Sequence, residues 1–438
     1  MRRSTFTGNW AGLCGIRPAE ICSIASTMKA MIKMFHLEDL LAVAAVLSIV
    51  VAPFLWQEVK LALLSAWFLA RALRCGSIFS VRRILALTAM ALVAAHGLFF
   101  VIIGIISGAL PDTLKYTVPL YVVFPLFFGA LSLVVERKDL DALFGILVLA
   151  TPFLSLYLIL YFLSQIGLIT APVPSFYDVS RVSLVDGHAG ISHHSVSSLL
   201  FMAPLYISYG LVMKRGRTTG IIYLIGFILL FLAIFTSNRR SILVISGLAC
   251  VLVVAYSVFV RNGVVSLRTV LSRLVLALMV TVFTVESYSA YTDINIDIYL
   301  SNVVNTVNKG ISDSESDEER VYQKDALLDS FFENVGFGKG HGVPIWLIRD
   351  EDKPWRYEMS FYANLHREGL IGFSIYVLLL LGIYAMPLWG MGVGRFSEID
   401  LCLYIASLTQ VAGYFVNPTL DSFDSYWQLV LPVWLFVV

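Results

Sequence analysis

Long apolar stretches separated by short polar turns make up most of this 438-residue chain. A helix needs about 20 mostly apolar residues to cross the hydrocarbon core of a bilayer. Stretches of this kind predict spans near residues 38–56, 58–73, 84–109, 117–135, 142–168, 195–213, 219–236, 241–260, 270–288, 364–387, 399–417 and 423–438. The pattern therefore predicts an all-α fold, a polytopic transmembrane helical bundle of about 12 spans.

One long polar segment, residues 289–363, interrupts this pattern between the ninth and tenth spans. It divides the chain into a cytoplasmic N-terminal tail (1–37), nine spans (38–288), the large loop itself (289–363) and three final spans (364–438). Loops of this kind tend to carry recognition and chemistry. Both ends of the chain leave alternatives open. Residues 1–35 are either a cytoplasmic tail or the product of a start codon placed too early. The last apolar run is a tilted span, a partial span or the end of a truncated chain.

Composition supports a membrane protein. Hydrophobic residues make up 58% of the chain and charged residues 14%, with a mean hydropathy of +0.82. A soluble globular protein is about one-quarter charged. The net charge of +1 comes with no basic patch, which argues against nucleic acid as a partner. The five cysteines avoid the polar loop and lack metal-like spacing, so neither a disulfide framework nor a zinc site is expected.

The distribution of lysine and arginine orients the chain. Short cytoplasmic loops carry an excess of these residues. With a cytoplasmic N-terminus, the inner loops hold Arg71, Arg74, Arg82, Arg83, Arg137, Lys138, Lys214, Arg215, Arg217, Arg261, Arg268 and Arg395. The outer turns are poor in them, so residues 289–363 are expected outside, in the periplasm if the cell has one.

Two external loops carry arginines against this charge rule. Arg239 and Arg240 occupy a tight turn before the eighth span, and Arg181 lies with three histidines in the loop from residue 170 to residue 194. An arginine offers a fixed fork of hydrogen-bond donors that suits phosphate. Anchoring to lipid headgroups or capping of a helix end is the structural alternative for these arginines.

Four elements between residues 170 and 387 resemble, in the same order, motifs of the bacterial O-antigen ligases and Wzy-type polysaccharide polymerases. They are the arginine of the smaller external loop (Arg181), an S-x-S-R-like element (Thr236–Ser241), an R…G-x-G stretch (Arg320 and Gly336–Gly340) and a loop exit that runs from Glu358 to G-L-I-G (Gly369–Gly372). Each motif is weak alone, and the specificity comes from the order and the matching topology.

The resemblance implies an enzyme of the bacterial inner membrane, with its active face outside. It would join undecaprenyl-pyrophosphate-linked oligosaccharide repeat units into O-antigen, capsule or exopolysaccharide. Ligases of this superfamily typically carry a histidine at the loop exit, where this chain has Glu358, and this departure favours a polymerase. A ligase that transfers glycan to lipid A core or another acceptor is the nearest alternative. A flippase or transporter of lipid-linked sugar is a further alternative, although the sequence shows no internal repeat.

The implied chemistry gives roles to the polar residues. Negative charge grows on the pyrophosphate as the glycosidic bond breaks, and preplaced cations stabilise it, a role expected for Arg181, Arg239, Arg240 and Arg320. A base must take the proton of the acceptor hydroxyl, and the candidates are Glu358, His341 and His366. No Asp-x-Asp motif sits directly beside these four arginines, so no metal or other cofactor is expected. The implied partners are the lipid-linked glycan and the bilayer, with a chain-length regulator and a flippase.

Helical periodicity places the first of these bases. At about 100° per residue, one helical face contains Glu358, Tyr362, Leu365, Gly369 and Gly372. The two glycines would let a neighbouring helix approach closely. This face is therefore expected to point into the bundle and to carry Glu358 toward the site.

Other polar residues have simpler explanations. His96 lies in the middle of a span and fits a hydrogen bond between helices. The three histidines of the loop 170–194 lack carboxylate or cysteine partners and fit solvated loop residues. The acidic run Asp313–Glu319 fits a solvated loop, and Arg320 fits a salt-bridged loop helix as well as a substrate contact.

Overall fold

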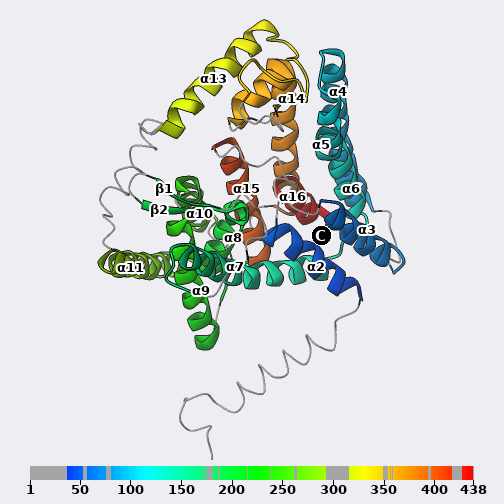
Figure 1. Cartoon of the computed structure of the whole chain (residues 1–438). Helices are drawn as coiled ribbons and strands as arrows, with labels where there is room; N and C mark the ends of the chain where they lie inside the picture. Colours follow the sequence, from blue (N-terminus) through cyan, green and yellow to red (C-terminus); the bar gives the residue numbers. More distant parts are fainter. Residues whose placement is uncertain are drawn as a thin grey trace, which may run out of the picture.

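The computed structural model describes residues 37–52, 57–74, 80–170, 173–174, 181–185, 188–214, 216–237, 239–260, 264–292, 315–348, 354–355, 357, 359–392, 396–416 and 427–437. Helices account for most of these residues (Figure 1). Every one of the twelve predicted apolar stretches contains helix. The prediction of a helical membrane protein is therefore confirmed.

The helices that cover the apolar stretches are α2 (Leu37–Val51), α3 (Gln57–Ala72), α4 (Val81–Ile106), the run of η2 (Pro111–Thr113), α5 (Leu114–Val118), η3 (Pro119–Val123) and α6 (Phe124–Leu131), α7 (Arg137–Gln165), η4 (His194–Ser198) with α8 (Leu199–Val212), α9 (Arg217–Thr236), α10 (Arg240–Phe259), α11 (Leu267–Thr292), α14 (Ser360–Met391), α15 (Glu398–Val416) and α16 (Trp427–Val437). Within the described residues, eight segments are long and apolar enough to cross a membrane: α4, η2 to α6, α7, η4 to α8, α9, α10, α11 and α14. One further helix, α13 (Glu315–Glu333), lies in the predicted polar loop.

Local sequence explains where two of these helices begin. Ser80 caps α4, and its hydroxyl accepts a hydrogen bond from the Arg83 backbone N–H at 3.2 Å. Glu136 precedes α7, and its backbone N–H donates to Asp139 Oδ2 at 2.8 Å. Side chains of this kind pair backbone groups that would otherwise stay unpaired at a helix start.

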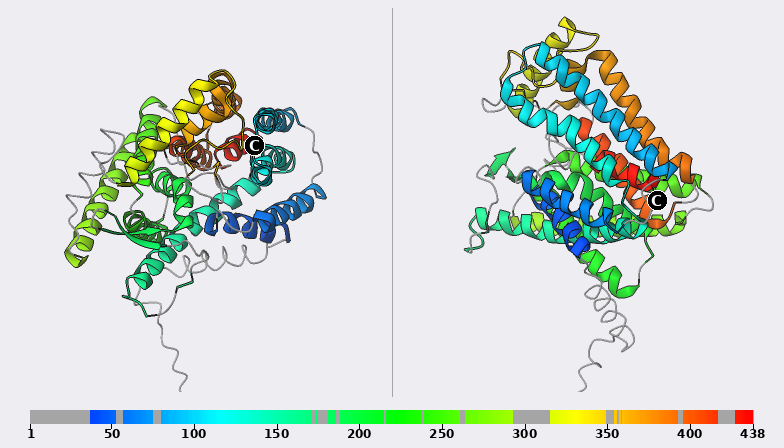
Figure 2. Two further views of the ribbon diagram at one scale, coloured as in Figure 1. Left: turned by 45° about the horizontal axis from the view of Figure 1, so that its top comes forward. Right: turned by 90° about the vertical axis from the view of Figure 1, so that its right-hand side faces the viewer.

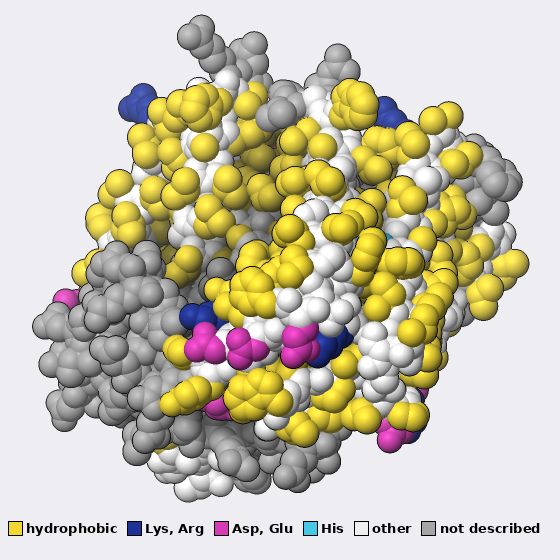
Figure 3. All heavy atoms as spheres, turned by 90° about the horizontal axis from the view of Figure 1, so that it is seen from above, with side chains coloured by type: hydrophobic (Ala, Val, Ile, Leu, Met, Phe, Trp, Pro, Cys, Tyr) yellow, Lys and Arg dark blue, Asp and Glu magenta, His cyan; other side chains and the backbone are white. Residues whose placement is uncertain are grey.

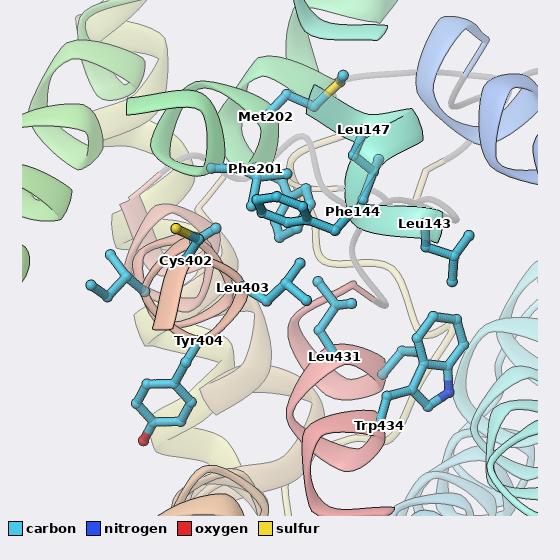
Figure 4. Close-up of a cluster of buried hydrophobic side chains, with 14 of the residues drawn as sticks. Leu143, Phe144, Leu147, Phe201, Met202, Cys402, Leu403, Tyr404, Leu431 and Trp434 are labelled. Carbon is cyan, nitrogen blue, oxygen red and sulfur yellow. The ribbon is translucent and has the colours of Figure 1, made fainter. Parts of the chain in front are cut away.

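The largest buried core lies where α7, α8, α15 and α16 meet (Figure 4). Leu147 of α7, Phe201 of α8, Leu403 of α15 and Trp434 of α16 are each at most 2% exposed. In lipid the hydrophobic effect does not drive helices together, so close packing of these side chains stabilises the bundle.

Three elements form the other end of the molecule. The helices α4 and α14 run side by side, and α13 packs against α14 (Figure 2). The view onto this end shows a short row of acidic and basic side chains across a largely hydrophobic surface (Figure 3). Exposed apolar side chains are expected where helices face lipid.

Buried ion pairs join helix ends that the charge distribution assigns to the cytoplasmic side. Arg71, near the end of α3, lies 3.5 Å from Glu38 of α2 and 2.7 Å from Asp139 of α7. Arg137, the first residue of α7, pairs with Asp400 near the start of α15. The starts of α2 and α7 and the end of α3 therefore lie close together, and the start of α15 lies beside the start of α7.

A two-stranded hairpin departs from the all-α prediction. Strand β1 (Arg181–Val185) pairs antiparallel with β2 (His188–Ser192), with Arg181 opposite Ser192. The expectation of solvated histidines is also wrong for His193, which is buried and whose Nδ1 accepts from the Ser195 backbone N–H at 3.1 Å. Its Nε2 lies 3.2 Å from the Tyr157 hydroxyl, so the end of the hairpin is tied to α7.

Candidate functional site

A break in α14 organises the site. Gly369 has φ 64° and ψ −175°, so the helix is interrupted there. The loop that follows α13 pairs with the backbone on both sides of the break: Lys339 N–H donates to His366 O at 2.9 Å, Gly340 N–H to Arg367 O at 2.7 Å, Leu370 N–H to Val335 O at 2.7 Å and Ile371 N–H to Gly336 O at 3.0 Å. The predicted continuous helical face from Glu358 to Gly372 is therefore wrong at Gly369. An interrupted helix leaves backbone groups that need new partners, and this loop supplies them.

Glycine makes this docking possible. Gly340 has φ +86°, and a Cβ added there would lie 2.0 Å from the backbone nitrogen of Gly104 in α4. Gly338 has φ +64°, and its added Cβ would lie 2.5 Å from the backbone nitrogen of Gly369. The G-x-G-like stretch and the G-L-I-G element of the sequence therefore meet in space. Gly372 also admits α4 closely, as predicted, because an added Cβ would lie 2.1 Å from the Phe100 ring.

A carboxyl group and two imidazoles lie close together where the loop docks on α14, and one of the imidazoles, His341, belongs to the loop. Glu368 is 2% exposed and His341 is 1% exposed. Glu368 Oε1 lies 3.7 Å from His341 Nε2, and Glu368 Oε2 lies 3.9 Å from His96 Nε2. Both separations are too long for hydrogen bonds. His96 Nε2 instead lies 3.0 Å from Gly372 O, which confirms the predicted hydrogen bond between helices.

Arg367 and Tyr121 form the wall beside this group. The Arg367 guanidinium donates to the Tyr121 hydroxyl at 3.2 Å and to the Trp355 carbonyl at 3.0 Å. The Tyr121 ring stacks on the His341 ring, with centroids 3.7 Å apart and an interplanar angle of 11°. His341 also donates its backbone N–H to Phe100 O at 2.9 Å. The imidazole is therefore fixed in place by its ring and its backbone.

Burial sets the protonation state of this imidazole. Removal from water, together with the nearby positive charge of Arg367, lowers the pKa of His341 well below its ordinary value of 6.5. His341 is therefore neutral at pH 7, with one N–H and one lone pair. Among the described residues, neither of its ring nitrogens has a hydrogen-bond partner, and the same is true of Glu368 Oε2.

The second histidine expected as a base has a different environment. His366 is fully buried, with Nδ1 2.9 Å from Ser330 Oγ and Nε2 3.2 Å from Val343 O. Because a carbonyl only accepts, Nε2 carries the proton and Nδ1 accepts from the Ser330 hydroxyl. Both nitrogens are engaged, and they link α13 and the docked loop to α14.

The expected arginines lie on other elements. Arg239 is half-buried in the turn before α10, and its backbone N–H donates to the Ser237 hydroxyl at 3.4 Å. Arg240 is the first residue of α10 and Arg181 the first of β1, and only their backbone positions are described. The strand β2 lies against α9, which ends just before Arg239, so the hairpin and this turn belong to the same part of the molecule.

Two expected site residues remain. Arg320 lies half-buried on α13. Glu358 lies outside the described residues, so its predicted role as a base is untouched by the structure. The contacts described above join His341 to α4, α14 and Tyr121. Arg239 directly precedes α10, and α10 packs mainly against α8, α15 and α11.

Sequence reasoning missed the residue at the centre of the cluster. Glu368 is not among the bases that the sequence analysis proposes, which are Glu358, His341 and His366. The signal that could have found it is the consecutive run His366-Arg367-Glu368 inside a predicted span. Ionisable residues are expensive in a membrane and mark functional sites.

The described part of the chain contains no group of three or more His, Cys, Asp or Glu side chains arranged to hold a metal ion. The cluster described above consists of a buried carboxyl group, a neutral imidazole and a guanidinium. The sequence matches no protein-family model, and it matches no curated protein either.

Proposed function

We propose that this chain is a membrane glycosyltransferase, a polymerase that joins undecaprenyl-pyrophosphate-linked oligosaccharide repeat units. One observation carries the proposal: the long polar loop inserts His341 against the buried Glu368 and Arg367 where α14 begins. Proton transfer and stabilisation of growing negative charge both gain strength where water is excluded. A cluster of this kind, at the end of a membrane helix, suits a substrate whose lipid tail lies in the bilayer.

The proposal includes a topology. Twelve spans place the N-terminus in the cytoplasm and the large loop at the external face of a bacterial inner membrane. Two observations support this arrangement. Ion pairs join Arg71 to Asp139 and Arg137 to Asp400, at ends assigned to the cytoplasmic side. The loop docks beside Gly104, near the opposite end of α4.

The arginines receive the leaving group in this proposal. Arg181, Arg239, Arg240 and Arg320 would contact the pyrophosphate, whose charge grows as the bond to the sugar breaks. The contact between β2 and α9, the helix that precedes the turn with Arg239, supports a shared role for Arg181 and Arg239. No cofactor is part of the proposal.

The rival functions differ in their products. A ligase would transfer a finished glycan once, to lipid A core or another acceptor, whereas a polymerase adds repeat units successively. A flippase would move the lipid-linked sugar without forming a covalent bond. Glu358 in place of the histidine that ligases typically carry supports the polymerase. A chain-length regulator and a flippase are the expected partners.

The test is elongation by the purified full chain in liposomes that contain lipid-linked repeat units. A ladder of products is expected from the wild type. Arg239→Ala should make no ladder while remaining at normal abundance in the membrane, and Arg239→Lys should restore little, because a point charge lacks the planar fork. The matched control is Arg82→Ala, an exposed arginine of the opposite side, which should elongate like the wild type. A single transfer product would favour the ligase, and transport without coupling would favour the flippase.

A further inference from the structure

Three buried polar atoms without partners gather under the docked loop. They are both ring nitrogens of His341 and Oε2 of Glu368, and none has a hydrogen-bond partner in the described residues. Each buried polar atom left unpaired costs about 1–3 kcal/mol. Native structures seldom leave such atoms unpaired, so an unpaired group calls for a ligand or a bound water.

The spacing of these groups suits one bridging oxygen. Glu368 Oε1 and His341 Nε2 are 3.7 Å apart. An oxygen about 2.8 Å from each atom would give the unpaired His341 Nε2 a partner and would bind Glu368 through Oε1, since hydrogen bonds of that length are ordinary. It would leave Glu368 Oε2 and His341 Nδ1 as they are. His96 is not a competitor, because its Nε2–H already donates to Gly372 O at 3.0 Å. The site therefore offers one carboxylate oxygen and one ring nitrogen to a single small group.

The chemistry of the two partners selects a hydroxyl group. A carboxylate oxygen only accepts, and a neutral imidazole can donate from Nε2. A hydroxyl can donate to the first and accept from the second at the same time. Arg367 precedes Glu368 in the chain and is held by the Tyr121 hydroxyl and the Trp355 carbonyl. A phosphate or carboxylate ligand would instead place a second negative charge beside Glu368.

We propose that Glu368 and His341 bind the oxygen of one hydroxyl group, and that Glu368 takes the proton from it. The inference rests on the proposed function for the source of the hydroxyl, which is then the acceptor sugar, and water is the other source of the same chemistry. In the reaction the O–H proton passes to the Glu368 carboxylate, and the oxygen forms a bond with the anomeric carbon. The bond from that carbon to the pyrophosphate breaks, and its electron pair leaves with the pyrophosphate.

The docked loop covers this site. Residues 335–343 cover Glu368, and backbone hydrogen bonds hold them to α14 and to Phe100 of α4. Loops that close over a substrate exclude water and complete a catalytic site. Release of these hydrogen bonds would expose Glu368 to an acceptor hydroxyl.

The first experiment compares two glutamates in the elongation assay. Glu368→Gln keeps the shape of the side chain and removes its basicity, so the elongation rate should fall by about 10²–10⁴. Donor binding should be unchanged, and the variant should lose the rise of rate with pH that a base produces. Glu58→Gln, at an exposed glutamate of α3, is the matched control and should stay within about threefold of the wild type. A Glu368→Gln variant within the same range and with the wild-type pH profile would overturn the inference.

A second experiment tests the oxygen site without any elongation. The infrared carboxyl band of Glu368 is identified in the wild type by its loss in Glu368→Gln, and methanol is added as a probe. The band should shift with methanol in the wild type, and the shift should disappear in His341→Phe. No shift at any methanol concentration that leaves the protein folded refutes the alcohol site. A response only to exchange of ordinary water for ¹⁸O-labelled water means that water alone binds, which overturns the role in the acceptor.

The two experiments separate the two proposals. A methanol shift in a wild-type protein that elongates nothing would keep the oxygen site and overturn the polymerase. Elongation by the wild type without any effect of Glu368→Gln would keep the polymerase and overturn the role of Glu368.

Discussion

Replacing Gly340 with alanine should release the docked loop from α14. The new Cβ would lie 2.0 Å from the Gly104 nitrogen, and the backbone at this position has φ +86°. A side chain in the left-handed region costs about 1–2 kcal/mol, and overpacking adds about 1–3 kcal/mol. The change should therefore destabilise the docked state by about 2–5 kcal/mol, which shifts the opening equilibrium roughly 30-fold to 5,000-fold.

Hydrogen exchange measures this opening directly. The backbone N–H groups of Lys339, Gly340 and His341 all donate across the docking interface. Peptides that contain these positions should exchange faster in Gly340→Ala by the factor given above, because exchange of a paired amide requires opening. The matched control is Gly382→Ala in α14, the helix on which the loop docks, where an added Cβ meets nothing within 4 Å. This control should leave exchange in the loop unchanged.

One result would refute the reasoning. If exchange at Lys339 to His341 rises by less than about threefold in Gly340→Ala, the free energy change is below about 0.7 kcal/mol. The loop would then tolerate a side chain that the structure excludes, and the docked arrangement against Gly104 would be wrong. If Gly340→Ala and Gly382→Ala gave the same exchange in the loop, the explanation that the G-x-G stretch needs glycine for close docking would also be wrong.

Three further predictions concern stability and topology. Arg71→Ala should lower the free energy of unfolding by about 3–5 kcal/mol because buried Asp139 loses its cation and keeps only the hydrogen bond from the Glu136 N–H. Lys115→Ala, in an exposed pair, should change thermal stability little. Thermal stability should fall as the pH drops below about 6.5, since the unfolded chain then binds a proton that folded His341 does not, and His341→Phe should flatten this slope. A cysteine placed at Ser314, in a chain without its native cysteines, should react with an impermeant thiol reagent from outside intact cells, and protection until the inner membrane is lysed would reverse the proposed orientation.

The helices were predictable because their signal is local. An apolar run long enough to cross a bilayer has few alternatives to helix, since every backbone group must be paired within it. The run that became α8 is an example, because it is apolar along its length and is buried from Leu199 to Leu205. The hydrogen bond of His96 was also predictable in kind, since an imidazole in a span needs a partner.

The centre of the site was not predictable because it depends on distant contacts. Periodicity continues through Gly369, and only the carbonyl and N–H partners from the loop explain why the helix stops there. Glu368 is buried by α4 and the loop, and the contact between His96 and Gly372 spans 276 residues of sequence. The hairpin from Arg181 was missed for a similar reason, since its two short strands stabilise each other and neither has a strong pattern alone.

The pair between Arg137 and Asp400 has a consequence for biosynthesis. The two residues are 263 positions apart, and ribosomes add roughly 5–20 residues per second, so about 13–50 s separate their synthesis. During this interval Arg137 has no Asp400 to neutralise it, and in the proposed orientation its charge helps to retain the start of α7 in the cytoplasm. Once α15 has been synthesised, Asp400 pairs with Arg137, and the residue that helped to orient α7 then joins α7 to α15.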